Sequence, residues 1–139
     1  MYFNDVSVGD SFPTLKKEKI TRVQLVKYAG ASGDFNPLHT VEEIGEEAGT
    51  GVIAHGMLIM GIVAEGIAKW IPRKHITKFQ VRFKKMTFPG ESIHVSGKVL
   101  EKREGNKIIG EIFASNADGE VKVAGTFEAV LPSRNNAIH

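Results

Sequence analysis

Residues 56–70 read GMLIMGIVAEGIAKW, and this segment determines how the rest of the chain is organised. It is too long for a typical strand, and its apolar side chains would lie on nearly every face of a helix rather than along one stripe. A helix that is apolar all round must be surrounded by protein. Pro72 follows closely, and helices tend to end before a proline. We therefore predict a buried central helix over residues 56–70.

After Pro72 the apolar residues recur at every second position, which is the period of a strand. Such runs lie at residues 79–84, 92–99, 108–114 and 121–129. Turn signals separate them, namely Pro89-Gly90, Gly105-Asn106 and Asp118-Gly119. With an extended segment over residues 11–20, the runs predict an antiparallel sheet. The simplest packing wraps the apolar face of this sheet around the central helix, in a two-layer α+β domain.

Two finer expectations concern which side chains point inward. Thr21 is a good N-cap for a short helix, since Gln24 follows three residues later as in a capping box. In that helix we expect Val23, Val26 and Ala29 to face the core, and a second short helix is expected over residues 41–48. In the last strand, alternation places one set of residues on the inner face. These are Val121, Val123, Gly125, Phe127 and Ala129.

Length and composition narrow the class of protein. A chain of 139 residues without a visible linker or repeat predicts a single domain over residues 1–139, with a frayed tail at 132–139. Its 42% hydrophobic and 24% charged residues permit a sizeable core and exclude intrinsic disorder. A net charge of +2 argues against a dedicated nucleic-acid-binding protein. The absence of cysteine excludes a disulfide scaffold, a zinc–thiolate site and a thiol nucleophile.

The same survey bears on membranes and location. The longest uncharged apolar stretch, residues 52–64, is shorter than the ~18 residues that suggest a membrane span. The N-terminal residues have neither a basic start nor an apolar run, so no signal peptide is visible. We therefore expect a cytoplasmic protein with neither a membrane nor a nucleic acid as partner.

Reactive side chains are concentrated in the loop that follows the first predicted helix, residues 32–39. Asp34 and His39 would lie about 140° apart on a helix, so they could not share a target there. Pro37 disfavours a helix, and a turn could bring Asp34, Asn36 and His39 to one space. A carboxylate and an imidazole that grip one water form an acid–base pair. On spacing alone the alternative stays open that Asp34 and Asn36 only cap a turn, with His39 exposed.

A second candidate is the start of the central helix, residues 54–58, which read AHGML. The first N–H groups of a helix are donors at the positive end of its dipole. Gly56 would allow a carbonyl oxygen to approach the backbone closely, as an oxyanion-binding site requires. The alternative is that Gly56 is a packing glycine and His55 a core or cap residue.

Residues 32–39, SGDFNPLH, followed by residues 53–58, IAHGML, resemble the MaoC-like (R)-specific enoyl-thioester hydratases and dehydratases. The resemblance extends over nearly the whole chain, including residues 81–83 and 88–91. These enzymes have the hotdog fold, an antiparallel β-sheet wrapped around a long central helix. The resemblance therefore implies an α+β hotdog domain, in agreement with the layout expected from the periodicity.

Carried over by position, the resemblance makes Asp34 and His39 the catalytic pair, with Asn36 helping to hold the water. The backbone N–H of Gly56 would bind the thioester carbonyl, and His55 would support the active site. The implied enzyme is a hydro-lyase of fatty acid metabolism that interconverts trans-2-enoyl and (R)-3-hydroxyacyl thioesters. Some relatives carry a serine on the central helix, whereas residues 57–70 contain neither Ser nor Thr. No role of that hydroxyl is therefore carried over.

Two other functions stay open at this point. A hotdog thioesterase would hydrolyse the same class of substrate with Asp34 and the helix N-terminus, and a non-catalytic module would only bind acyl-CoA. The Asp-x-Asn-Pro-x-His order favours the hydratase, because a binding module has no need of an acid–base pair. No metal and no organic cofactor is expected, and the carrier of the acyl group would be coenzyme A or acyl carrier protein.

The basic residues and the sheet edges predict contacts outside the catalytic loop. Residues 73–85 are rich in Lys and Arg and contain no acidic residue. Within this run Arg82, Lys84 and Lys85 are candidates for contacts with carrier phosphates, the alternative being charges that only keep an outer strand soluble. A single sheet also leaves edges that must be covered or paired, so we expect a homodimer or a dimer of dimers.

Overall fold

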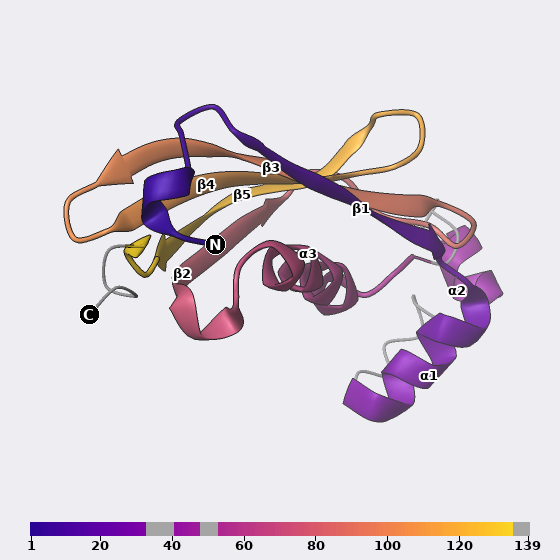
Figure 1. Cartoon of the computed structure of the whole chain (residues 1–139). Helices are drawn as coiled ribbons and strands as arrows, with labels where there is room; N and C mark the ends of the chain where they lie inside the picture. The colour runs from indigo at the N-terminus through magenta and orange to yellow at the C-terminus, as the bar shows by residue number, and fades with distance from the viewer. Residues whose placement is uncertain (33–40, 48–52, 135–139) are drawn as a thin grey trace.

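The computed structural model describes residues 1–32, 41–47 and 53–134. These residues form one antiparallel sheet with the strand order β1-β3-β4-β5-β2 and a small set of helices, as Figure 1 shows. The strands are β1 (Ser11–Lys19), β2 (Ile76–Phe83), β3 (Ser92–Arg103), β4 (Lys107–Ser115) and β5 (Val121–Val130). The helices are α1 (Arg22–Ser32), α2 (Glu42–Glu47) and α3 (Gly56–Trp70), with the short 3-10 helices η1 (Phe3–Asp5) and η3 (Arg73–His75). The predicted two-layer α+β arrangement is confirmed.

The hairpin between β3 and β4 shows why the turn signals were informative. Gly105 and Asn106 have φ angles of 80° and 59°, which lie in the left-handed region. Glycine and asparagine adopt this region more readily than other residues do. The two strands then pair in antiparallel register from Arg103 opposite Lys107 to His94 opposite Ser115. The turn chemistry therefore placed this hairpin correctly.

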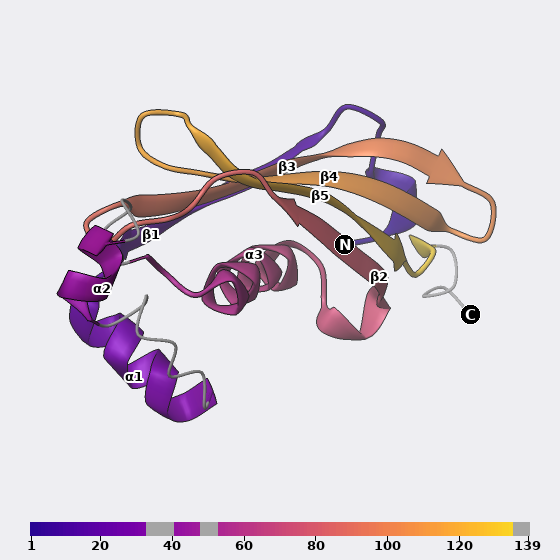
Figure 2. The same cartoon turned by 180° about the vertical axis from the view of Figure 1, so that it is seen from behind.

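Helix α3 occupies the bounds that the apolar segment predicted, Gly56–Trp70. It lies against the concave face of the sheet, as both views show (Figures 1 and 2). Ile59, Val63 and Ile67 point into the core and are at most 3% exposed. The helix is not enclosed all round, because one sheet covers one face. Gly61 on the other side is exposed, and Met60 and Ala64 are half-buried.

The far end of α3 is fixed by aromatic packing. The ring of Trp70 stacks on that of Phe12 in β1, with centroids 4.7 Å apart and planes 10° from parallel. The indole N–H of Trp70 donates a hydrogen bond of 2.6 Å to the carbonyl of Pro13. Ile71, the residue after the helix, is fully buried. This end of the helix is thus joined firmly to the sheet.

Helices α1 and α2 lie at one end of the sheet, near the start of α3 (Figures 1 and 2). The predicted N-cap is confirmed, since the N–H of Gln24 donates to Oγ1 of Thr21 at 3.0 Å. The predicted inner face of α1 was wrong in part. Val23 and Val26 are 63% and 57% exposed, whereas Leu25 and Ala29 are buried. The helix touches the core only along the narrow stripe formed by positions i and i+4, so the valines on its other sides stay outside.

The expectation of a frayed tail at 132–139 concerns a segment of which the structure describes the first three residues. The carbonyl of Pro132 accepts a hydrogen bond from the N–H of Phe3, and the N–H of Arg134 donates to the side chain of Asn4 at 2.8 Å. Residues 132–134 are therefore attached to η1. Residues 135–139 lie outside the described residues. Within the described part of the chain, no helix is both long and apolar enough to cross a membrane.

Candidate active site

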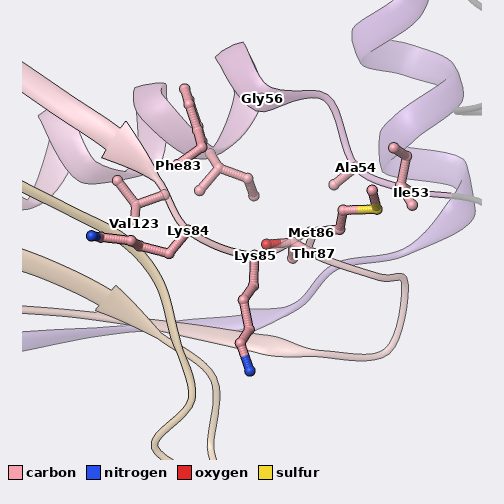
Figure 3. A pocket seen from close by; sticks show the side chains of 10 residues that line it. Ile53, Ala54, Gly56, Phe83, Lys84, Lys85, Met86, Thr87 and Val123 are labelled. Atoms are coloured by element: carbon pink, nitrogen blue, oxygen red, sulfur yellow. The ribbon is translucent and has the colours of Figure 1, made fainter. Parts of the chain in front are cut away.

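A cavity of about 320 Å³ lies beside the start of α3 (Figure 3). Its walls come from three separate segments: the start of α3 with the residues before it, the end of β2 with the residues after it, and β5. The lining residues are Ile53, Ala54, Gly56, Ile59, Phe83, Lys84, Lys85, Met86, Thr87 and Val123. The cavity therefore opens where the start of the central helix meets the edge of the sheet.

The start of α3, where a helix carries backbone N–H groups without intrahelical acceptors, lines this cavity. His55 has an extended backbone conformation, and its carbonyl accepts hydrogen bonds from the N–H groups of Leu58 and Ile59. The N–H groups of the first helical residues have no acceptor within a helix, and Gly56 is the first residue of α3. Gly56 is exposed, and the nearest atom to a Cβ added there would be Cζ of Phe83, at 3.5 Å. Glycine thus keeps the space between the helix start and the phenyl ring open.

His55 itself lies inside the protein. It is 1% exposed, and its ring meets that of Tyr28 in α1 edge to face, with centroids 4.7 Å apart. This contact joins α1 to the residue immediately before α3. His55 is therefore next to Gly56 in the chain, but its side chain packs toward α1.

The other predicted site residues, Asp34, Asn36 and His39, lie outside the described residues. They follow α1, which ends at Ser32, and precede α2, which begins at Glu42. Their catalytic roles stay predictions from the resemblance.

Ion pairs around a buried lysine, Lys122, lie behind the wall of the cavity, and the sequence did not predict them. Ala114 pairs with Val123 while Ser115 pairs with Val121, so Lys122 is the extra residue of a β-bulge in β5. The bulge places the side chains of both Lys122 and Val123 inside, and each is 1% exposed. It also leaves Val121 36% exposed, so the predicted inward position of this residue was wrong.

Among the described residues, the ammonium group of Lys122 has three oxygen partners. It donates to the carbonyl of Met86 at 2.8 Å, and it pairs with carboxylate oxygens of Glu120 at 2.7 Å and Glu91 at 3.1 Å. Burial lowers the pKa of Lys122, but its hydrogen bonds with the two carboxylates outweigh this effect and hold the pKa above its ordinary value. The group therefore stays charged at neutral pH. Strict alternation would have turned Lys122 outward, and no residue pattern in the sequence marks the bulge.

Glu91 connects this network to the turn after β2. One carboxylate oxygen accepts a hydrogen bond from the N–H of Phe88 at 2.9 Å, and the other accepts one from the side-chain amide of Asn116 at 2.8 Å. Burial raises the pKa of Glu91, but the bonds from Asn116 and Phe88 and the charge of Lys122 hold it below its ordinary value. The carboxylate is therefore ionised and holds one end of the turn.

The predicted basic residues divide into two groups. Arg82 in β2 and Lys84, the residue after β2, line a second cavity of about 500 Å³ with Gln80 and Thr126. Lys84 also lines the first cavity. Lys85 lines the first cavity too, but it forms an ion pair of 3.1 Å with Glu120. The N–H groups of Lys84 and Lys85 both donate to the carbonyl of Lys122, so the alternation is interrupted between them.

No group of three or more His, Asp or Glu side chains within residues 1–32, 41–47 and 53–134 could hold a metal ion. The expectation that the chain needs neither a metal nor an organic cofactor stays a prediction.

Comparisons with known proteins agree on one family. The model of the MaoC like domain matches residues 4–120. The chain is 28% identical over 136 residues to fatty acid synthase subunit beta of Gibberella zeae, which covers 95% of this chain and 6% of that protein. It is 32% identical over 83 residues to the probable enoyl-CoA hydratase 2 of Dictyostelium discoideum, with 57% and 28% covered. The chain thus spans less than a third of the length of either curated relative.

Among solved structures, the unliganded R-hydratase PhaJ1 from Pseudomonas aeruginosa is similar over almost its full length. Its TM-score is 0.83 at 26% identity, with 96% of this chain and 86% of that chain covered. The likeness therefore extends over nearly all of this chain.

Proposed function

The chain belongs to the family of MaoC-like domains, and from this premise we propose that it is an (R)-specific enoyl-thioester hydratase/dehydratase. It would add water to trans-2-enoyl thioesters and, in the reverse direction, dehydrate (R)-3-hydroxyacyl thioesters. The observation that carries the proposal is the cavity at the start of α3. There the first backbone N–H groups of the helix and the open space at Gly56 meet a largely apolar wall. A thioester carbonyl held at such a place would have its developing negative charge stabilised.

The chemistry needs an acid–base pair as well as the oxyanion donor. In the proposed reaction, the pair Asp34 and His39 takes a proton from a water that Asn36 helps to hold. The water oxygen forms a bond with C3, and the electron pair of the C2=C3 bond moves toward the thioester oxygen at the Gly56 N–H. A proton delivered to C2 by the same pair then completes the addition of water on one face.

We further propose that Arg82 and Lys84 attract the anionic carrier, coenzyme A or acyl carrier protein. The support is that both residues line the second cavity and that Lys84 also lines the first cavity, at the start of α3. Lys85 contributes less in this proposal, because Glu120 already neutralises much of its charge. Exposed ion pairs are each worth only about 0–1 kcal/mol, so these residues tune affinity rather than create it.

The chain is proposed to pair with a second copy through β2. Of the two edges of the sheet, β1 carries Pro13, three lysines and register shifts against β3, which are features that protect an edge. Strand β2 pairs with β5 without interruption from Lys78 to Phe83, so its outer side is regular. Phe83 and Met86 at its end are 49% and 50% exposed. Light scattering should give twice the mass of 15.2 kDa or more, and a monomer with full activity would contradict this.

The proposed activity is tested with purified protein and crotonyl-CoA, by following the enoyl absorbance and the free thiol in parallel. We expect the enoyl absorbance to fall without release of thiol. Thiol release with an intact enoyl band would identify a thioesterase. Binding of the thioester without either change would identify a non-catalytic module. The cytoplasmic location expected from the sequence also stays a prediction.

A further inference from the structure

The segment that lines one side of the cavity, residues 84–87, is held at its beginning and its middle by one residue. The carbonyl of Lys122 accepts the N–H groups of Lys84 and Lys85, at 2.8 Å and 3.2 Å. The ammonium group of the same residue donates to the carbonyl of Met86 at 2.8 Å. Backbone and side chain of Lys122 thus fix the beginning and the middle of the segment together.

The segment in turn holds the residue that leads into α3. Thr87 is 3% exposed, and its carbonyl accepts a hydrogen bond of 2.8 Å from the N–H of Ala54. Ala54 is followed by His55 and by Gly56, the first residue of the helix. A continuous chain of short contacts therefore runs from the ammonium group of Lys122 to the backbone donor at the cavity.

We propose that Lys122 is a positioning residue for the oxyanion-binding N–H of Gly56, an inference that rests on the proposed hydratase function. The residue touches no substrate. It sets the distance between the cavity wall at Met86 and Thr87 and the start of α3. A misplacement of about 1 Å in a site of this kind costs on the order of 10² in rate, so a small shift of the segment has a large effect.

The structure also explains why a lysine is needed rather than any buried side chain. An apolar residue of similar size would fill the space, but it could not donate to the carbonyl of Met86. It would also leave the carboxylate of Glu91 without the ammonium group of Lys122, and the carboxylate of Glu120 with Lys85 alone. Removal of one member of a buried ion pair leaves the remaining charge uncompensated, so the segment would rearrange.

The first test compares Lys122→Met with the wild type. We expect kcat for crotonyl-CoA hydration to fall about 10- to 100-fold, with KM within about threefold, because the oxyanion charge develops mainly in the transition state. A purely structural role would lower Tm and leave kcat per folded molecule unchanged. The matched control is Lys98→Met, which removes a lysine from β3 that pairs with Glu111 at 3.8 Å.

A spectroscopic readout separates carbonyl polarisation from binding. The absorbance of bound 2,4-hexadienoyl-CoA shifts to the red when hydrogen-bond donors polarise its thioester carbonyl. The wild type and Lys98→Met should both show the shift, and Lys122→Met should bind the ligand with a smaller one. A full red shift and full kcat in Lys122→Met would overturn the inference. If the wild type shows neither hydration nor a red shift, the proposed function and this inference fall together.

The absence of cysteine from the sequence permits a chemical rescue. In Lys122→Cys, bromoethylamine applied to the unfolded chain and followed by refolding alkylates that single thiol and restores an ammonium group at nearly the length of lysine. We expect the alkylated protein to recover most of the kcat and the red shift that the unalkylated variant has lost. A recovered fold without recovered kcat would contradict the inference.

If the apolar variant does not fold, Lys122→Arg decides the question. Arginine keeps the charge for the two carboxylates, but its longer side chain must displace the Met86 carbonyl in a site where Lys122 is 1% exposed. A fall in kcat of about threefold or more, at nearly unchanged Tm and KM, would support the positioning role. Unchanged kcat and red shift would contradict it.

Discussion

The two ends of α3 are held in different ways. At the C-terminal end of α3, the ring of Trp70 stacks on that of Phe12, and its indole N–H donates to the carbonyl of Pro13. The surrounding residues are largely apolar and buried. At the start of α3, the N–H of Ala54 reaches the carbonyl of Thr87. Beside that contact, Lys122 holds the carbonyl of Met86. One end thus depends on packed rings, and the other on a few polar contacts between distant segments, next to a cavity.

This difference indicates that the two ends of α3 have different roles, one in stability and the other in positioning. Apolar packing at the end of α3 supplies stability, which adds up over many contacts and tolerates small shifts. The polar contacts at its start supply position, which a single broken contact can destroy. Mutations at the two ends should therefore separate stability from activity.

The largest expected effect concerns the predicted acid–base pair. Asp34→Asn or His39→Ala should each lower kcat by roughly 10²–10⁴, the usual contribution of a positioned acid or base. Stability should change little in either variant, since the change is chemical. Steady-state kinetics with crotonyl-CoA and thermal unfolding measure the two quantities. Asp118→Asn, at an exposed turn, is the control, and near-normal kcat in both variants would show that the assignment is wrong.

The next largest effect is expected at the C-terminal end of α3, and it concerns stability. Trp70→Ala removes the stacked ring and the indole donor, and should cost about 3–5 kcal/mol of unfolding free energy. Trp70→Phe keeps a ring against Phe12 and should lose about 1 kcal/mol for the missing hydrogen bond. Urea unfolding measures both values. If kcat per folded molecule fell as steeply in Trp70→Ala as in Gly56→Ala, the two ends of α3 would not be separable.

A smaller effect is expected for the glycine at the cavity. Gly56→Ala places a methyl group 3.5 Å from the Phe83 ring, a normal contact that preserves the fold but narrows the space for the thioester carbonyl. We expect kcat to fall about 10- to 100-fold with Tm unchanged or slightly raised. Gly61→Ala is the matched control, because its added Cβ would have no atom within 4 Å. Equal activity of the two variants would remove Gly56 from the site.

The smallest effect is expected for the basic residues that are proposed to attract the carrier. Arg82→Ala or Lys84→Ala should raise KM severalfold and leave kcat nearly unchanged, and Lys85→Ala should have less effect because Lys85 pairs with Glu120. The increase should shrink as salt is added, since exposed charges are screened beyond ~10 Å at 0.1 M. KM values that are equal in wild type and variants at every salt concentration would show that these charges only solubilise β2.

The parts of the fold that could be predicted are those that depend on local properties of the sequence. The bounds of α3 and the β3–β4 hairpin could be predicted because apolar periodicity and turn residues are local properties of the chain. The inner face of α1 could not, because its orientation depends on where the helix meets the sheet, and Val23 and Val26 point outward. The apolar residues of a short helix do not by themselves show which of its faces will be buried.

Only part of the candidate site could be predicted from the sequence. The motif residues Gly56 and Arg82 could be named from the sequence, and the structure places them at two cavities. Lys122 could not be named, since its burial depends on a bulge that appears only when β5 pairs with β4. A positioning contact between segments that are far apart in sequence leaves no local pattern.

The central claim, that the chain is an (R)-specific enoyl-thioester hydratase, is tested most directly by the configuration of the product. The wild-type protein is incubated with crotonyl-CoA in water, and the 3-hydroxybutyryl product is resolved on a chiral column. We expect the (R) product, formed without free coenzyme A. A predominantly (S) product, or free coenzyme A with unreacted enoyl groups, would contradict it.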